Sequence, residues 1–267
     1  PSTAGCITFP VTAVSMLSAW RDQSVTLLVL GIGWQIAATA LNNPLLPTPL
    51  AVMDLMHDLW QQGELQSHLW ITLQRVLISF GIAMFLGAIL GVLMGRFRNL
   101  NRWFDPFLVL LLNIPALVVI ILLYVWFGLV EAAAVAAVVI NKLPNVAVTL
   151  REGARTFDPE LEEMAQVYHF SFGQRVRHIW WPQLFPFVMV ATRSGLALIW
   201  KIVLVVELLG RSDGIGFQLH LAFQLFDVTA ILAYSFAFIV VVQLIEWCLL
   251  QPTEQYAVRW KRELNHG

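Results

Sequence analysis

Charge is the scarcest feature of this 267-residue chain. Asp, Glu, Lys and Arg make up only 12% of it, about half the share found in a soluble globular domain. Apolar residues make up 58%, and the mean hydropathy is +0.73. These values exclude a soluble globular protein. The chain also has no block of basic residues, which excludes a nucleic-acid-binding segment. We therefore expect an integral membrane protein.

Cysteine is also rare, and the motifs of metal and nucleotide chemistry are missing. The two cysteines, Cys6 and Cys248, lie far apart in the sequence and form no disulfide framework. The six histidines form no HExxH zinc motif. The chain contains no GxxxxGKS or GxxxxGKT loop to hold phosphates. We expect no catalytic residue, no metal site and no cofactor in this chain.

Six stretches are long and apolar enough to cross a membrane. A hydrocarbon core of about 30 Å needs about 20 apolar residues at about 1.5 Å rise each. Each span must be helical, because lipid offers no partner to an unpaired backbone group. The sequence therefore predicts an all-α membrane domain over 24–250, between short terminal segments 1–23 and 251–267. The expected spans are 24–41, 68–95, 106–127, 131–149, 184–209 and 229–250.

Lys and Arg are distributed unevenly between the predicted loops. One side holds eleven of the sixteen, namely Arg21, Arg96, Arg98, Arg102, Arg151, Arg155, Arg175, Arg177, Arg259, Lys261 and Arg262. The loops on the other side hold only Arg211, and four more lie within spans. Because cytoplasmic loops carry the excess of Lys and Arg, we expect both termini and the loop 150–183 to be cytoplasmic.

The first outer loop, 42–67, contains a predicted amphipathic helix. Its apolar residues recur at three-to-four spacing from Val52 to Leu59. Gly63 is expected to end this helix. We expect the helix to lie along the outer membrane face.

The second span carries small residues at strict four-residue spacing, namely Ser79, Ala83, Gly87, Gly91 and Gly95. Small residues on one helix face let a neighbouring backbone approach closely. The neighbour is either another helix of the same chain or a second copy of it. The alanine-rich fourth span, 131–149, is expected to be buried among other helices.

The third span contains Asn113 and Pro115, which interrupt an otherwise apolar helix. Proline removes a backbone hydrogen bond and kinks the helix. The freed carbonyl then needs a partner or water. Two interpretations stay open: a kink that serves packing, or a wall of a translocation pathway.

Charged residues also lie within the spans. A charge at hydrocarbon depth costs at least about 2.5 kcal/mol on insertion scales, so it should face protein or water. Arg193, Lys201 and Glu207 are therefore candidates either for structural pairing or for lining a pathway. Glu207 and Arg211 are four residues apart and can pair. Arg75 lies near the predicted end of its span and can extend to the membrane surface.

The longest interruption of the apolar sequence is the loop 150–183. Asp158-Pro159 predicts the start of a helix, with an apolar stripe from Phe157 to Tyr168. A second short helix is expected at about 172–180. Two short helices tied to long spans would act as a lever that grips another protein. The alternative from the residues alone is a solvated amphipathic loop.

This loop resembles the EAA loop in the inner-membrane permease subunits of binding-protein-dependent ABC importers. The family pattern is Glu-Ala-Ala, three residues, Gly, nine residues, Ile, one residue, Leu-Pro. Glu163, Ala165, Ile179 and Pro182 stand at matching positions. His169 replaces the glycine. His is one of the few other residues enriched at positive φ, so we expect the tight turn to be kept.

More of the chain is similar to the nitrate/taurine/sulfonate-type branch of these permeases. The similarity covers about residues 45–250. Where the branch shows a Pro-x-Pro-Pro run, this chain has Asn113-Ile114-Pro115-Ala116. The matching pieces, in order, are Leu46-Pro47-Thr48-Pro49, Thr72-Leu73-Gln74-Arg75-Val76, Asp105-Pro106, Trp126-Phe127-Gly128, Asp158-Pro159-Glu160-Leu161, Val206-Glu207-Leu208-Leu209-Gly210 and Gly214-Ile215-Gly216.

The resemblance implies a fold, partners and a mechanism. The fold is that of a type I ABC importer permease with a cytoplasmic coupling helix, in the bacterial inner membrane. A second permease subunit, expected to be a second copy, would complete one pathway for a small solute such as an oxyanion or a sulfonate. Two ATP-binding subunits, holding ATP and Mg, would grip the coupling loops, and a periplasmic binding protein would deliver the solute. The implied coupling residues are Glu163, Ala165, His169, Gly173 and Pro182, with Glu163 touching the ATPase and Ala165 allowing close approach.

Two other function classes remain. An ion-gradient-driven secondary transporter is the first, although such folds often show paired repeats and none is visible here. A membrane-embedded hydrolase is the second, because 210–214 fits the GxSxG pattern around Ser212. That motif needs a strand before it, whereas a helix is predicted there.

Overall fold

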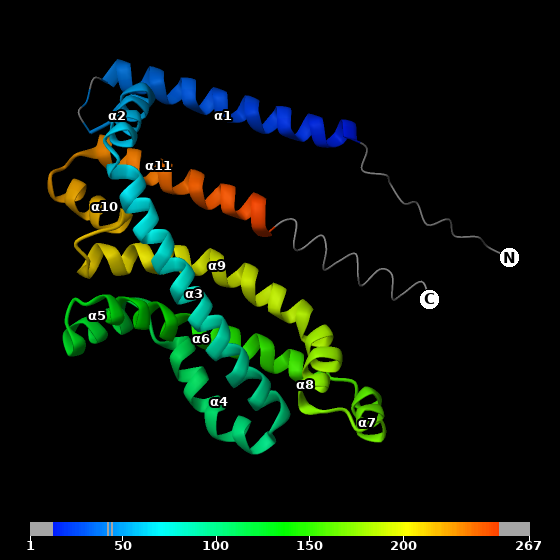
Figure 1. The fold of residues 1–267 in the computed structure, drawn as a ribbon. Helices are drawn as coiled ribbons and strands as arrows, with labels where there is room; N and C mark the ends of the chain where they lie inside the picture. Colours follow the sequence, from blue (N-terminus) through cyan, green and yellow to red (C-terminus); the bar gives the residue numbers. More distant parts are fainter. Residues whose placement is uncertain (1–12, 42, 44, 251–267) are drawn as a thin grey trace.

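The computed structural model describes residues 13–41, 43 and 45–250, and all of its regular secondary structure within these ranges is helical (Figure 1). The elements are α1 (Ala13–Leu41), α2 (Pro49–Gln62), α3 (Glu64–Arg96), α4 (Arg98–Asn113), α5 (Ala116–Phe127), α6 (Glu131–Arg155), α7 (Pro159–Val167), α8 (Phe172–Arg175), the π-helix η1 (Val176–Trp180), α9 (Trp181–Gly210), α10 (Ile215–Gln224), α11 (Val228–Ile245) and the π-helix η2 (Glu246–Leu250). The expected all-α fold is confirmed.

Four helical runs of the described chain are long and apolar enough to cross a membrane. They are α3, α6, the continuous run Phe172–Gly210, and Val228–Cys248. Helices α4 and α5 make a fifth crossing if the pair is counted as one span. The predicted span 24–41 lies in α1, of which the part Leu28–Leu41 is apolar but shorter than a full crossing.

The third predicted span is broken rather than merely kinked. Helices α4 and α5 meet at an angle of 98°. The break falls at Ile114-Pro115, where both residues have extended backbone angles, and the Asn113 side-chain amide donates to the carbonyl of Val109 at 2.7 Å. Proline explains the break, because it cannot continue the hydrogen-bond ladder of α4. By contrast, Pro144 lies inside α6 without interrupting it.

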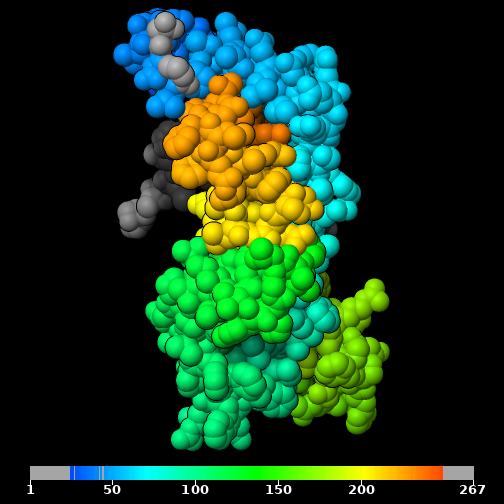
Figure 2. Space-filling model, turned by 90° about the vertical axis from the view of Figure 1, so that its left-hand side faces the viewer, coloured from blue at the N-terminus to red at the C-terminus, as the bar shows by residue number. Residues whose placement is uncertain are grey.

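The helices run between two ends of the molecule (Figure 1). One end, here the α10 end, carries α2, α10 and the α5–α6 connection, and Figure 2 looks onto it. The other, the α7 end, carries α7 and α8. The first described turn of α1 and the last turns of α11 also lie toward the α7 end (Figure 1). Helix α1 lies at one edge, where the Trp34 indole donates to the carbonyl of Pro47 at 3.0 Å and its ring packs on Phe236.

Helix α2 and its end agree with the sequence-based prediction. The Thr48 hydroxyl accepts the amide N–H of Ala51 at 3.2 Å, and Pro49 occupies the first turn. Val52 is buried and Leu59 packs on the core. Gly63 ends the helix with a φ of 81°, in the left-handed region.

Small residues bring α3 against α6 along most of their length. Ser79, Ala83, Gly87 and Gly91 are all buried within this single chain. A methyl group added at Gly91 would lie 2.5 Å from the carbonyl oxygen of Ala147, so the two backbones are in direct contact. Intrachain packing is therefore the correct interpretation of this stripe, and the dimer seam is wrong.

Replacing Gly91 by Ala should separate α3 from α6. The added methyl group has no room beside Ala147, and overpacking of this kind costs about 1–3 kcal/mol. Gly81→Ala is the matched control on the same helix, because a methyl group there meets no atom within 4 Å. Thermal unfolding in detergent should show a lower Tm for Gly91→Ala and an unchanged or higher Tm for Gly81→Ala. Equal values for the two variants would contradict this packing.

Candidate functional site: a coupling loop and intramembrane charges

Helix α7 begins as the sequence predicts. The Asp158 carboxylate accepts the amide N–H of Glu160 at 2.9 Å, and Pro159 stands at the first helical position. A carboxylate at this position accepts a hydrogen bond from an amide that would otherwise lack a partner. Its negative charge also interacts favourably with the positive end of the helix dipole. The Gln183 side chain accepts the Asp158 amide at 2.8 Å, which joins the start of α7 to α9.

Glu162 holds α7 to the body of the protein. Its buried carboxylate accepts Arg96 Nη2 at 2.7 Å, Trp180 Nε1 at 3.2 Å and Arg175 Nη1 at 3.4 Å. The Arg96 guanidinium also lies 5.7 Å from the centre of the Trp180 ring. Glu162 of α7 thus links the last turn of α3, α8 and η1.

The turn after α7 confirms the expectation for His169. Its φ is 52°, in the left-handed region. The amide N–H of Phe170 donates to the carbonyl of Ala165 at 2.9 Å, and that of His169 donates to Gln166 at 3.1 Å. These two bonds define a Schellman ending of a helix, which usually places glycine where His169 stands.

The second short helix does not remain separate. Ser171 and Gln174 form a reciprocal capping box at the start of α8. From there α8 passes through the π-helix η1 into α9 without a break, so Phe172–Gly210 is one helical run of 39 residues. Pro182 lies half-buried in the first turn of α9, where proline is tolerated.

The side chains of the loop divide into a buried and an exposed set. Ala165 is fully buried within the chain. Its predicted close approach is therefore to the rest of the chain and not to an ATPase, which corrects that expectation. Glu163 is exposed. A methyl group added at Gly173 meets nothing within 4 Å, so packing does not require glycine there. Apolar and aromatic side chains of the loop also face outward, among them Met164, Val167, Tyr168 and Phe172.

The His169 turn gives a direct test of the loop. His169→Gly should preserve it, because glycine adopts positive φ freely, whereas His169→Val should open it, because the left-handed region costs a residue with a Cβ about 1–2 kcal/mol and a β-branched one more. Amide hydrogen exchange over 159–175 should be about tenfold faster or more in the valine variant. Equal exchange in both variants would contradict the positive φ.

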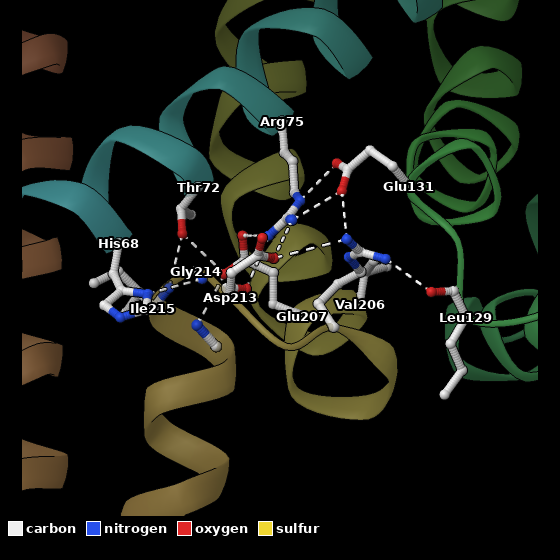
Figure 3. Close-up of polar contacts among 12 residues, drawn as sticks. His68, Thr72, Arg75, Leu129, Glu131, Val206, Glu207, Asp213, Gly214 and Ile215 are labelled. Atoms are coloured by element: carbon white, nitrogen blue, oxygen red, sulfur yellow. Dashed lines mark hydrogen bonds and ion pairs between the residues drawn. The ribbon is translucent and has the colours of Figure 1, made fainter.

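A second polar site lies at the α10 end, around Arg75 (Figure 3). The Arg75 guanidinium from α3 is almost fully buried and points into a group of carboxylates from other elements. Its Nη1 lies 2.8 Å from Glu207 of α9, its Nε lies 2.7 Å from Glu131 of α6, and its Nη2 lies 2.5 Å from Asp213 in the turn before α10. One cation therefore joins four segments.

Glu207 is fully buried, and its partners account for both oxygens. In addition to Arg75, its carboxylate accepts the Thr72 hydroxyl and the amide N–H of Gly216, each at 2.9 Å. The Thr72 hydroxyl in turn accepts the amide of Ile215 at 2.9 Å. A buried carboxylate needs this number of donors to offset its lost hydration. Glu207 therefore serves structural pairing, one of the two roles that its sequence left open.

Two sequence-based expectations about these charges are wrong. Arg75 does not extend to the membrane surface, because its side chain is only 5% exposed and is held by carboxylates. Glu207 does not take Arg211 as its cation. Arg211 instead lies 3.0 Å from Glu131 and donates to the carbonyl of Leu129 at 2.8 Å. The four-residue spacing along α9 favoured a pair between Glu207 and Arg211. The tertiary fold instead places Arg75 of α3 beside Glu207.

Three members of this site were missed. None of the three was given a role in this site from the sequence: Thr72 entered only in a piece that matches the family, Asp213 only within the GxSxG match, and Glu131 not at all. The available signal was weak: Thr72 and Arg75 are three residues apart on one helix face, and Glu131 stands at the start of a helix.

Removing Arg75 should destabilise the protein strongly. Arg75→Met leaves the Glu207 carboxylate buried without a cation, a change that costs about 3–5 kcal/mol in other buried pairs. Combining it with Glu207→Gln removes both charges and should restore part of the loss. Arg102→Met, an exposed cation at the α7 end, is the control. Thermal unfolding in detergent measures all four proteins. A double variant as unstable as the single one would mean that the pair is not coupled.

The remaining pathway candidates occupy exposed positions. Asn113 and Pro115 lie exposed at the α4–α5 break. Arg193 and Lys201 lie exposed on α9 and line one cavity beside α11. The structure thus brings Arg193 and Lys201 together and places Glu207 elsewhere. The described residues contain no group of three or more His, Cys, Asp or Glu side chains that could hold a metal ion.

Comparison with known proteins supplies the family. Residues 83–249 match the model of the binding-protein-dependent transport system inner membrane component. The chain belongs to this family. SsuC of Escherichia coli strain K12, which bears the name of an aliphatic sulfonates transport permease, is 32% identical over 69% of this chain and 71% of its own length. The riboflavin transport system permease protein RibX of Chloroflexus aurantiacus is 29% identical over 95% of this chain and 98% of its own.

Solved structures agree on the fold. An inward-facing structure of the MetNI methionine ABC transporter aligns with a TM-score of 0.59 at 16% identity, over 70% of this chain and 93% of the other. The expected type I permease fold is confirmed.

Family membership decides between the function classes. The chain is a multi-pass inner-membrane permease subunit of an ABC importer, a transport subunit rather than an enzyme. It works with an ATPase and a binding protein. The secondary transporter and the membrane hydrolase are therefore wrong. The segment around Ser212 is a turn after helix α9, not the strand-to-helix elbow of a hydrolase, and its Asp213 belongs to the Arg75 site.

Proposed function

We propose that two copies of this chain form one pathway for a small solute, with an ATP-binding subunit on each coupling loop. The α7 end then faces the cytoplasm together with both chain termini. The α10 end faces the periplasm, where a binding protein delivers the solute. The positive-inside distribution of Lys and Arg supports this orientation.

The observation that carries the proposal is the construction of the coupling loop. Glu162 and the His169 turn hold α7 and α8 rigidly on the body. Val167 and Phe172 are nevertheless each 73% exposed. A rigid element that exposes apolar side chains outside the bilayer is suited to docking in a groove of another protein. Glu163 lies exposed on the same helix and would contact the ATPase there.

The second copy is supported by two exposed cations on α9. Arg193 and Lys201 are exposed on a helix that must cross the membrane. Cations at hydrocarbon depth face protein or water, not lipid. A pathway between two copies would surround these cations with protein and water. The exposed Asn113 and Pro115 at the α4–α5 break are candidates for the wall of this pathway.

The transported solute is proposed as a small oxyanion, a sulfonate such as taurine, or a related small organic compound. The relatives differ in what their names say they carry, sulfonates in one case and riboflavin in another. The family therefore supports a small solute and does not select among these.

The docking surface is tested by charging one exposed apolar side chain. Val167→Asp should prevent co-purification of the ATP-binding subunit, because a buried unpaired carboxylate at the interface is costly. Phe226→Asp is the matched control. Phe226 is 74% exposed, lies at the α10 end and has a φ of 54°, which Asp tolerates. The ATP-binding subunit should accompany Phe226→Asp at full yield. If it accompanied Val167→Asp equally well, α7 would not be the docking site.

A further inference from the structure

The outward face of α4 changes its chemical character along the helix. Its first two turns present two exposed arginines, Arg98 and Arg102. Beside them stands Trp103, which is 75% exposed. The following two turns present apolar side chains instead, among them Phe107 and Leu110, and these are exposed as well. One face of a single helix thus passes from cationic through aromatic to apolar.

The opposite face of α4 is fixed on the body of the protein. Leu108 is buried and belongs to one apolar cluster with Met94 of α3 and Ala147 of α6. Arg151 of α6 also forms an ion pair with Asp105 of α4. These contacts hold the helix in one orientation about its axis, and they determine which of its side chains face outward.

The two arginines have no counter-charge in the described part of the chain. Arg98 and Arg102 are four residues apart, so they are neighbours on the helix surface. Neither has a hydrogen bond or an ion pair with another residue that the structure describes. The carboxylate nearest to them in the sequence, Asp105, is paired with Arg151 instead. Two positive charges therefore face outward side by side.

These residues lie where a span leaves the hydrocarbon core. Helix α4 follows directly on α3, whose last turn carries Arg96, and Arg96 donates to Glu162 of α7 at 2.7 Å. The start of α4 therefore lies at the α7 end, and its apolar turns continue into the possible crossing formed with α5. Tryptophan is enriched at this boundary, and arginines near helix ends extend toward the headgroups.

We infer that Arg98, Arg102 and Trp103 form a binding site for an anionic phospholipid in the leaflet at the α7 end. The two guanidinium groups bind the headgroup phosphate by charge-assisted hydrogen bonds. Trp103 and Phe107 contact the upper part of the acyl chains.

The order of the side chains along α4 favours a lipid over a protein as the occupant. Charge, aromatic ring and apolar surface follow one another as headgroup, interface and hydrocarbon do in a leaflet. In the orientation proposed above, this is the cytoplasmic leaflet. The inference goes beyond the proposed transport function, and it needs neither the ATP-binding subunit nor the solute.

The test measures lipid binding by native mass spectrometry. The full chain is purified in a neutral detergent with any subunits that accompany it. Phosphatidylglycerol and phosphatidylcholine with identical acyl chains are titrated separately, and the ratio of their affinities is the headgroup preference. Arg98→Gln and Arg102→Gln are made singly and together. Arg177→Gln is the matched control, because Arg177 is an exposed arginine at the α7 end but lies outside this site.

The native protein should prefer phosphatidylglycerol, and each arginine removed from the site should lower this preference about fivefold, the contribution of one basic residue near an anionic surface. Arg177→Gln should keep the preference. Trp103→Ala should weaken the binding of both lipids alike, because its indole contacts acyl chains and not the headgroup. An unchanged preference in the double variant would overturn the inference.

The same spectra identify a protein occupant. A double variant that keeps the lipid preference but loses the ATP-binding subunit, or separates into single copies, would assign this face to that protein and overturn the lipid site. A double variant that loses the preference and keeps its subunits supports the site. Its Tm in detergent should equal that of the native protein, because substitutions of exposed side chains change stability little.

Discussion

The buried guanidinium of Arg75 is the constraint on which the α10 end of this protein depends. A cation inside a membrane domain is costly unless it is paired or faces water. Here the pairing carboxylates come from Glu131, Glu207 and Asp213, on three different segments. The helices that carry them must therefore meet around α3. The same cluster of charges holds the start of α10, because the Glu207 carboxylate also accepts a hydrogen bond from the amide N–H of Gly216.

The α7 end is organised by the same physical rule with the signs exchanged. There a buried carboxylate, Glu162, gathers donors from three segments. The two polar centres stand at opposite ends of one continuous helical run, Phe172–Gly210. Arg175 near its start belongs to the Glu162 centre, and Glu207 near its end belongs to the Arg75 centre. One continuous helical run thus joins the loop 150–183 to the α10 end.

The charges of α9 differ in burial. Glu207 has all of its partners within one chain and is a structural residue. Arg193 and Lys201 lie exposed on the same helix and line one cavity beside α11. Burial therefore separates the charge that this chain encloses from the two that lie at its surface.

The sequence by itself determined the class of the protein, because composition and span length depend only on local chemistry. Low charge and long apolar stretches require membrane helices, and the small-residue face of α3 requires a close neighbour. The left-handed turn at His169 was also local, since it follows from the position after a helix. The tertiary structure alone decided the partners of Arg75, which lie 56, 132 and 138 residues away in the chain. No periodicity relates such distant residues, so only the packed helices could show that these charges are paired.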